Sequence, residues 1–151
     1  MTAKGRLLGV DYGTVRIGLA VSDPDRIIAS PLATYSRRDP RTDVQYFREL
    51  VQTETLVGLV VGLPVHLSGR EGQKATEARA FGKWLAEATG LPLVFYDERF
   101  TTVQAESALW EAGLTHKRRK DRRDRVAAQM LLQAYLNVGC PPEETPRALD
   151  D

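Results

Sequence analysis

Residues 9–21 read GVDYGTVRIGLAV, which is two apolar runs separated by a short turn that contains Gly13. Asp11 stands at the end of the first run, and apolar residues resume at Ile17. The pattern predicts a strand, a tight turn and a second strand, so the carboxylate of Asp11 should lie at the rim of a sheet. A dinucleotide-binding fold is disfavoured, because its glycine-rich turn opens a helix rather than a strand.

The composition is that of one globular domain. The chain has 151 residues, of which 42% are hydrophobic and 27% charged, and its formal net charge is +1. This size is sufficient for a single core, and the balanced charge points to no particular partner. Cys140 is the only cysteine, so an internal disulfide is impossible and a reducing cytoplasm is expected. A membrane partner is not expected, because the sequence has no signal-peptide core and no apolar run near ~20 residues.

Apolar runs and turn signals predict the element order β-β-β-α-β-α-β-α-α. The turn between the first two runs is too short for a crossover, so these strands should pair antiparallel. The apolar run at residues 56–63 lies between helical segments and should pair in parallel with the first strand. The strands are expected at residues 6–11, 16–22, 27–34, 56–63 and 91–96, and the helices at residues 40–53, 71–89, 101–112 and 123–138, with a basic loop at 114–120.

The order as a whole predicts an α/β fold with one mixed five-stranded sheet. Its first three strands should be antiparallel, its last two parallel to the first, and helices should cover both faces. Residues 1–139 are expected to form a single domain, and residues 140–151, which contain two adjacent prolines, a flexible tail. Ligands bind outside the carboxyl ends of strands in open α/β sheets, so this edge is where a site is expected.

Acidic side chains gather at the expected edge. Asp11 ends the first strand, and Asp97 and Glu98 follow the last one. Asp121 and Asp124 lie at the start of the final helix. Hard oxygen donors, with one cysteine and few histidines, suit Mg²⁺ or Mn²⁺ rather than zinc. Two such ions about 4 Å apart would activate a water and stabilise the leaving oxygen of a phosphodiester.

Spacing helps to choose among these acids. Neighbouring residues of a strand point to opposite faces, so Asp97 and Glu98 cannot both face the site, and we favour Glu98. Asp121 and Asp124 lie about one helical turn apart, and we favour Asp124 because the apolar residues 126–128 indicate close packing on the sheet. Each acid alone could be solvated or cap a helix. Together they indicate a metal-dependent hydrolytic site.

Four motifs occur in register over nearly the whole chain. They are VDYGT at residues 10–14 with RIGLA at 16–20, VVGLP at 60–64 with Gly69, DERFTT at 97–102, and Asp124 with Ala127 and Ala128. This set resembles the YqgF/RuvX family, small bacterial proteins described as pre-16S rRNA nucleases or as Holliday-junction-resolvase-like. The resemblance implies an RNase H-like fold and divalent-metal-dependent hydrolysis of nucleic-acid phosphodiesters.

Matched position by position, the resemblance places the catalytic, metal-binding acids of the family on Asp11, Glu98 and Asp124. It implies two bound ions, Mg²⁺ or Mn²⁺. The chain departs from the family at His66, where asparagine is frequent. Better-known resolvases of this fold carry an acid at the end of the fourth strand, where this chain reads GLP at residues 62–64.

Basic residues are densest at residues 116–125, around Asp124. Such a run could bind phosphates beside the scissile bond, with strong salt dependence, or could be a solvated surface loop. Arg16 and Arg99 could brace the acids or contact phosphate. The candidate nucleic-acid-binding residues are Arg16, Arg99, Lys117, Arg118, Arg119, Lys120, Arg122 and Arg123.

Three functions are compatible with these features. The first, which we favour, is an endonuclease acting on the 5′ end of pre-16S rRNA or on four-way DNA junctions; junction cutting would favour a homodimer, since paired cuts need two sites. The second is a non-catalytic nucleic-acid-binding factor of ribosome assembly with the same fold. The third is an actin-like or sugar-kinase-like phosphotransferase, which also begins with Asp-x-Gly-Thr and a second strand. A chain of 151 residues has no room for the two-lobed nucleotide cleft of that class.

Overall fold

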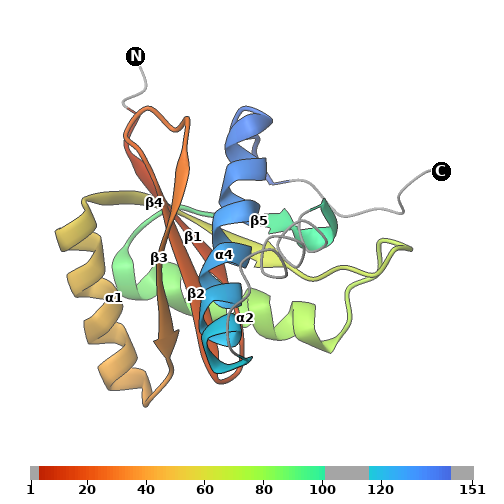
Figure 1. Ribbon diagram of the computed structural model, residues 1–151, viewed down its shortest axis with the longest axis horizontal. Helices are drawn as coiled ribbons and strands as arrows, with labels where there is room; N and C mark the ends of the chain where they lie inside the picture. Colours follow the sequence, from red (N-terminus) through yellow and green to blue (C-terminus); the bar gives the residue numbers. More distant parts are fainter. Residues whose placement is uncertain (1–3, 101–115, 144–151) are drawn as a thin grey trace.

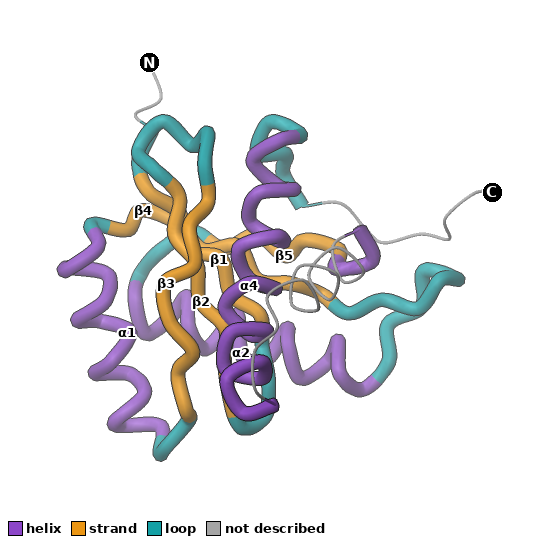
Figure 2. The backbone as a smooth tube through the Cα atoms, viewed as in Figure 1, coloured by secondary structure: helices purple, strands orange, loops and turns teal. Residues whose placement is uncertain are grey.

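The computed structural model describes residues 4–100 and 116–143. These residues form one mixed five-stranded sheet in the order β3-β2-β1-β4-β5, with helices on both faces (Figure 1 and Figure 2). The fold class expected from the sequence is therefore confirmed. The strands are β1 (Arg6–Asp11), β2 (Arg16–Ser22), β3 (Ala29–Ser36), β4 (Leu56–Leu63) and β5 (Leu93–Asp97); the helices are α1 (Pro40–Glu54), α2 (Gln73–Thr89), the 3-10 helix η1 (Glu98–Phe100) and α4 (His116–Asn137).

The register brings the carboxyl ends of the parallel strands to one edge of the sheet. β1 pairs antiparallel with β2, where Asp11 lies opposite Gly18. β1 pairs in parallel with β4, and β4 pairs in parallel with β5, where Leu63 lies opposite Asp97. The end of β1 and the junction of β5 with η1 therefore emerge at the same edge, with β4 between them.

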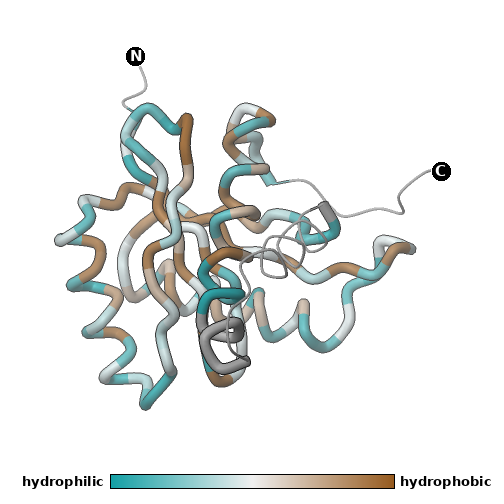
Figure 3. Tube along the Cα trace, viewed as in Figure 1, coloured by the Kyte–Doolittle hydropathy of each residue, from teal (hydrophilic) through white to brown (hydrophobic). Residues whose placement is uncertain are grey.

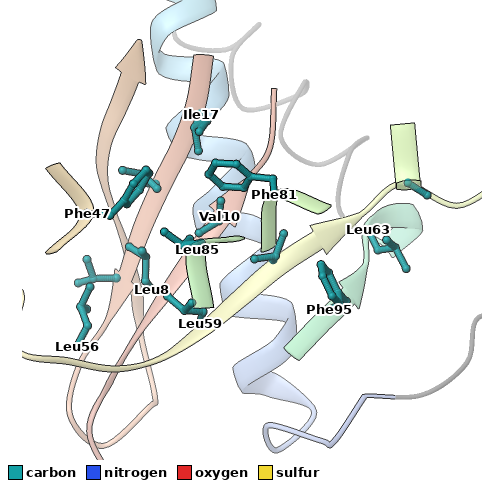
Figure 4. Close-up of a cluster of buried hydrophobic side chains, with 14 residues drawn as sticks. Leu8, Val10, Ile17, Phe47, Leu56, Leu59, Leu63, Phe81, Leu85 and Phe95 are labelled. Atoms are coloured by element: carbon teal, nitrogen blue, oxygen red, sulfur yellow. The ribbon is translucent and has the colours of Figure 1, made fainter. Parts of the chain in front are cut away.

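The sheet has a hydrophobic core on each face, because neighbouring strand residues point in opposite directions. On one face, Leu8 of β1 packs in a cluster with Phe47 of α1 and Leu85 of α2 (Figure 4). On the other face, Leu132 and its neighbours on α4 pack against residues of β1, β2 and β4. α4 thus crosses the second face alone among the described helices (Figure 1).

The start and the end of α1 follow from its sequence. Asp39 caps the helix by accepting a hydrogen bond from the backbone N–H of Thr42 at 2.8 Å, and Pro40 fits the first turn. The helix ends at Thr55, which adopts a left-handed conformation with φ 54°. Figure 3 shows hydrophobic and hydrophilic residues alternating along α1, as expected for a helix with one face on the core.

β3 begins two residues later than the sequence indicates. The Asp23 carboxylate accepts hydrogen bonds from the backbone N–H groups of Ile27, at 2.7 Å, and Ile28, at 2.9 Å. These bonds hold both residues in the turn after β2, so the ladder starts at Ala29. Both isoleucine side chains are exposed.

The sequence predicts a basic loop at residues 114–120. This prediction is wrong, because the chain is already helical from His116. No glycine or proline occurs between residues 114 and 138, and lysine and arginine are good helix formers, so nothing in the sequence delays the helix. The helix expected at residues 101–112 lies outside the described residues. Among the helices of residues 4–100 and 116–143, none is long and apolar enough to cross a membrane.

Residues 140–143 begin the segment expected to be a flexible tail. The Tyr135 hydroxyl donates a hydrogen bond to the carbonyl of Pro141 at 2.7 Å. A carboxylate oxygen of Glu143 accepts one from the backbone N–H of Phe95 at 3.2 Å. Glu143 therefore covers a backbone donor on β5, an edge strand of the sheet.

Candidate active site at the carboxyl ends of the parallel strands

Asp11 belongs to the side of β1 that faces α4. Leu8 and Val10 point into the core under α1 and α2, so Gly9 and Asp11 point the other way. The position of Gly9 agrees, because a Cβ added there would lie 2.8 Å from the Cβ of Leu132 on α4. The half-buried Asp11 side chain therefore stands at the rim of the α4 face.

The neighbouring acids Asp97 and Glu98 contact different residues. The Asp97 carboxylate accepts hydrogen bonds from the backbone N–H of Arg99 at 2.9 Å and from its Nε at 2.7 Å. The Glu98 side chain hydrogen-bonds the Asp11 side chain and lies against the backbone of Gly62 in β4. The structure thus places Glu98, and not Asp97, beside Asp11.

Asp124 reaches the same edge from α4. Its backbone carbonyl lies against Gly18, the residue opposite Asp11 in the ladder of β1 and β2. Its carboxylate accepts a hydrogen bond from Arg16 Nε at 2.7 Å, and the two side chains are 19% and 33% exposed, respectively. The third acid of the predicted set is therefore near Asp11 but is engaged by an arginine.

Burial and like charges perturb the acids at this edge. The pKa of Asp11 is raised well above its ordinary value, first by burial and then by the charge of Glu98, the hydrogen bond with Glu98 and the charge of Asp124. Burial also raises the pKa of Glu98, against smaller lowering effects from the hydrogen bond with Asp11 and the positive charge of Lys74. Two adjacent carboxyl groups that resist joint ionisation share a proton or accept a cation.

The donor set fits a hard divalent cation. Carboxylate oxygens are the ligands that Mg²⁺ and Mn²⁺ prefer, and a cation between Asp11 and Glu98 would relieve the repulsion between them. Within residues 4–100 and 116–143, however, no group of three or more His, Cys, Asp or Glu side chains is arranged to hold a metal ion. Asp11 and Glu98 are in contact with each other, whereas Asp124 pairs with Arg16.

The basic residues named from the sequence fall into distinct environments. The Arg99 side chain is only 7% exposed, pairs with Asp97 and donates hydrogen bonds to the carbonyls of His66 and Leu67, so it braces the β4–α2 connection. Arg122 and Arg123 are exposed on α4. The segment with Lys117, Arg118, Arg119 and Lys120 forms the first turns of the same helix.

Three residues that shape the site are not among the site residues expected from the sequence. Gly18 and Gly62 interrupt apolar strands, and an isolated strand glycine is a recognised signal of close approach by another segment. That signal could have identified both positions. Lys74 lies at the start of α2, and its effect on Glu98 depends on packing that sequence spacing does not reveal.

The sheet order, with helices on both faces, is that of an RNase H-like fold. The chain belongs to the RuvX family, whose model, described as Holliday junction resolvase, matches residues 5–138. A relative from Rhodopirellula baltica, named "Putative pre-16S rRNA nuclease", is 51% identical over 136 residues, which are 90% of this chain and 79% of that protein.

Two solved structures share the fold at low sequence identity. RuvC of T. thermophilus in complex with a Holliday junction substrate superposes with a TM-score of 0.53 at 18% identity, over 95% of this chain and 99% of the other. The Fowlpox virus resolvase in complex with Holliday junction DNA gives a TM-score of 0.53 at 10% identity, over 88% of this chain and 97% of the other.

Proposed function

We propose that this protein is a divalent-metal-dependent endonuclease that hydrolyses nucleic-acid phosphodiesters, at the 5′ end of pre-16S rRNA, at Holliday junctions, or at both. Family membership and the name of the Rhodopirellula relative support a hydrolytic nuclease. The observation that carries the proposal is the contact of the Asp11 and Glu98 carboxyl groups, whose pKa values are both raised, at the carboxyl ends of the parallel strands.

In this proposal Asp11, Glu98 and Asp124 are the catalytic acids and would hold one or two Mg²⁺ or Mn²⁺ ions. Such ions supply a water of lowered pKa and a Lewis acid for the leaving oxygen. The chain itself positions the acids: β1 carries Asp11 to the rim, and η1 fixes Glu98 against β4. Arg99 holds the start of η1 through Asp97 and through the loop after β4.

The basic start of α4 would bind phosphates on either side of the bond that is cut. Arg122 and Arg123 are exposed beside Asp124, and Lys117 to Lys120 precede them in the same helix. Arginine forks match phosphate geometry, and phosphate contacts position a nucleic acid without reading its sequence. We place this reaction in the cytoplasm, without a membrane partner, and expect a homodimer where a four-way junction is the substrate.

The test is cleavage of two end-labelled substrates by the purified protein, a precursor 16S rRNA fragment and a four-way DNA junction. We expect cleavage of at least one of them with Mg²⁺ or Mn²⁺, and none with EDTA. Cleavage that persists in EDTA would contradict metal dependence. Tight binding of both substrates without cleavage under any metal would contradict the nuclease assignment.

A non-catalytic nucleic-acid-binding factor of ribosome assembly is the second candidate. Two observations favour it: Asp124 is paired with Arg16, and the described residues contain no group of three acids arranged to hold a metal ion. The same assay separates the two functions, because a binding factor retains the nucleic acid and leaves it intact.

Replacing Gly62 with alanine is expected to lower cleavage about a hundredfold, because displacement of a catalytic group by ~1 Å costs about that much. The added Cβ would overlap the Glu98 carboxylate, which must then turn away from Asp11. The displaced atoms end a flexible side chain, so the free energy of unfolding should fall by only about 1 kcal/mol. The measurements are single-turnover cleavage rates and urea unfolding. Wild-type cleavage by folded Gly62→Ala would contradict the role given to Glu98.

Replacing Arg122 and Arg123 together with glutamine is expected to weaken nucleic-acid binding on every sequence alike. The slope of log K against log salt concentration should fall by about 2, since each phosphate contact contributes about 1. The double variant Arg41→Gln/Arg48→Gln on α1 is the charge-matched control, because α1 covers the opposite face. Equal slopes for the two double variants would contradict the assignment of α4 to the substrate.

A further inference from the structure

The ion pair between Arg16 and Asp124 joins β2 to α4 at the edge of the candidate active site. Arg16 Nε lies 2.7 Å from Asp124 Oδ2. The hydrogen bond is charge-assisted, which makes it stronger than a bond between neutral groups. The Arg16 side chain is nevertheless one-third exposed, so solvent and ligands can reach it. The ion pair is therefore strong, and a ligand can still reach the Arg16 side chain.

Asp124 is within electrostatic reach of the carboxylate pair. Its charge contributes to the raised pKa of Asp11, and its backbone rests on Gly18, the ladder partner of Asp11. The described residues nevertheless contain no three-acid group arranged for a metal ion. Asp124 forms a short ion pair with the guanidinium group of Arg16.

We propose that Arg16 is a positioning residue that withholds Asp124 from the metal, and that a backbone phosphate of the bound nucleic acid draws the guanidinium away and completes the site. This inference rests on the proposed function. The bare protein then binds its metal with two acids, and the protein with substrate binds it with three. The guanidinium exchanges one anionic partner, the Asp124 carboxylate, for another, a phosphate, to which it also donates charge-assisted hydrogen bonds.

The consequence is thermodynamic coupling between metal and nucleic acid. A ligand that removes Arg16 from Asp124 raises the affinity for the metal, and by reciprocity the metal raises the affinity for that ligand by the same factor. Metal binding before substrate would be weak, so hydrolysis is restricted to the complex in which a phosphate lies at Arg16.

The first experiment measures Mn²⁺ binding to the protein without nucleic acid, by electron paramagnetic resonance. Arg16→Gln should bind Mn²⁺ about tenfold more tightly than the wild type, and Arg16→Lys should lie between them because lysine keeps the charge without the fork. Lys74→Gln is the matched control, since it removes a positive charge that acts on Glu98. It should tighten Mn²⁺ binding less than threefold. An equal effect of Arg16→Gln and Lys74→Gln on the Mn²⁺ affinity would overturn the proposal. It would mean that Arg16 acts only through its positive charge and not through its ion pair with Asp124.

The second experiment repeats the titration with Ca²⁺, an ion of looser geometry than Mg²⁺, in the presence and absence of a four-way DNA junction. Gel analysis of the recovered DNA checks that it stays intact. The junction should raise the Ca²⁺ affinity of the wild type about tenfold and that of Arg16→Gln less than twofold. Equal coupling in both proteins would overturn the proposal.

The metal site at Asp11 and the role of Arg16 can be disproved separately. Asp11→Asn should lose Mn²⁺ binding in either case, because it removes a member of the carboxylate pair. If Asp11→Asn loses the metal while Arg16→Gln binds it no better than the wild type, the role of Arg16 is overturned and the metal site stands. If Asp11→Asn binds Mn²⁺ as the wild type does, both are overturned.

Discussion

Asp11→Asn should lose at least about a hundredfold in cleavage and, at neutral pH without metal, unfold at a higher temperature than the wild type. The activity falls because the variant removes a carboxylate from the pair that would hold the metal; even indirect partners of metal ligands cost 10- to about 100-fold when mutated. The stability rises because asparagine has no charge to bury and ends the repulsion with Glu98; burial and that repulsion both raise the pKa of Asp11. The measurements are single-turnover cleavage and thermal unfolding in EDTA.

The stabilising effect of Asp11→Asn has a defined pH dependence. The pKa of Asp11 lies near 3.8 in the unfolded chain and well above that in the folded protein, so the folded state holds the proton more tightly. The contribution of Asp11 to wild-type stability is therefore fully present below the unfolded value and is lost as pH rises from there through the folded pKa. Asparagine does not titrate, so the difference in melting temperature between variant and wild type should be small near pH 4 and grow towards pH 8.

Asp97→Asn is the control for the expected rise in melting temperature. It removes an acid one residue from Glu98, but one whose carboxylate pairs with the buried Arg99 side chain. Breaking that pair leaves a guanidinium group without its carboxylate, so Asp97→Asn should lower the melting temperature. If Asp11→Asn lowered the melting temperature at pH 8 in EDTA as Asp97→Asn does, the repulsive pair would be disproved.

Gly18→Ala should destabilise the protein by about 3 kcal/mol and abolish cleavage. A Cβ at this position would overlap the backbone carbonyl of Asp124, and a helix backbone cannot rotate aside as a side chain can. Relief requires α4 to move off the sheet, which opens the core beneath Leu132 and carries Asp124 away from Asp11. Overpacking of this kind costs about 1–3 kcal/mol or more. Urea unfolding and the cleavage assay measure both effects.

Gly58→Ala is the matched control, since Gly58 also lies inside a strand of the same sheet. A Cβ there meets the end of the Leu7 side chain, Cδ2, at 2.8 Å, and that group can change rotamer. The loss of stability should be smaller, about 1 kcal/mol, and the site should be unaffected. Equal losses for the two alanine variants would contradict the close approach of α4 to β2.

Local pattern predicted the sheet because its strands carry clear signals. β1, β2 and β4 have the bounds expected from their apolar runs. Strand alternation does not by itself separate Asp97 from Glu98, because β5 ends at Asp97 and Glu98 begins η1. The sequence does not fix the start of α4, because a run of like charges indicates a loop as readily as a helix surface. Helix propensity decided the outcome.

Contacts between distant segments could not be predicted in this way. Asp43 on α1 is buried, where it accepts hydrogen bonds from the Tyr35 hydroxyl at 2.5 Å and the backbone N–H of Arg38 at 3.0 Å. Burial and the hydrogen bond to Asp43 raise the pKa of Tyr35 to about 12. The Arg16–Asp124 pair likewise joins residues 108 positions apart. Such pairs depend on how helices dock on the sheet, and no periodicity in the sequence encodes that.

The most direct test is the position of the metal itself. Crystals grown with Mn²⁺ should show an anomalous difference peak between the carboxylates of Asp11 and Glu98, with Asp124 as a further ligand when nucleic acid is bound. A map without a peak at Asp11 and Glu98 at millimolar Mn²⁺, or with its peak at another set of residues, would contradict a metal-dependent nuclease built on these acids.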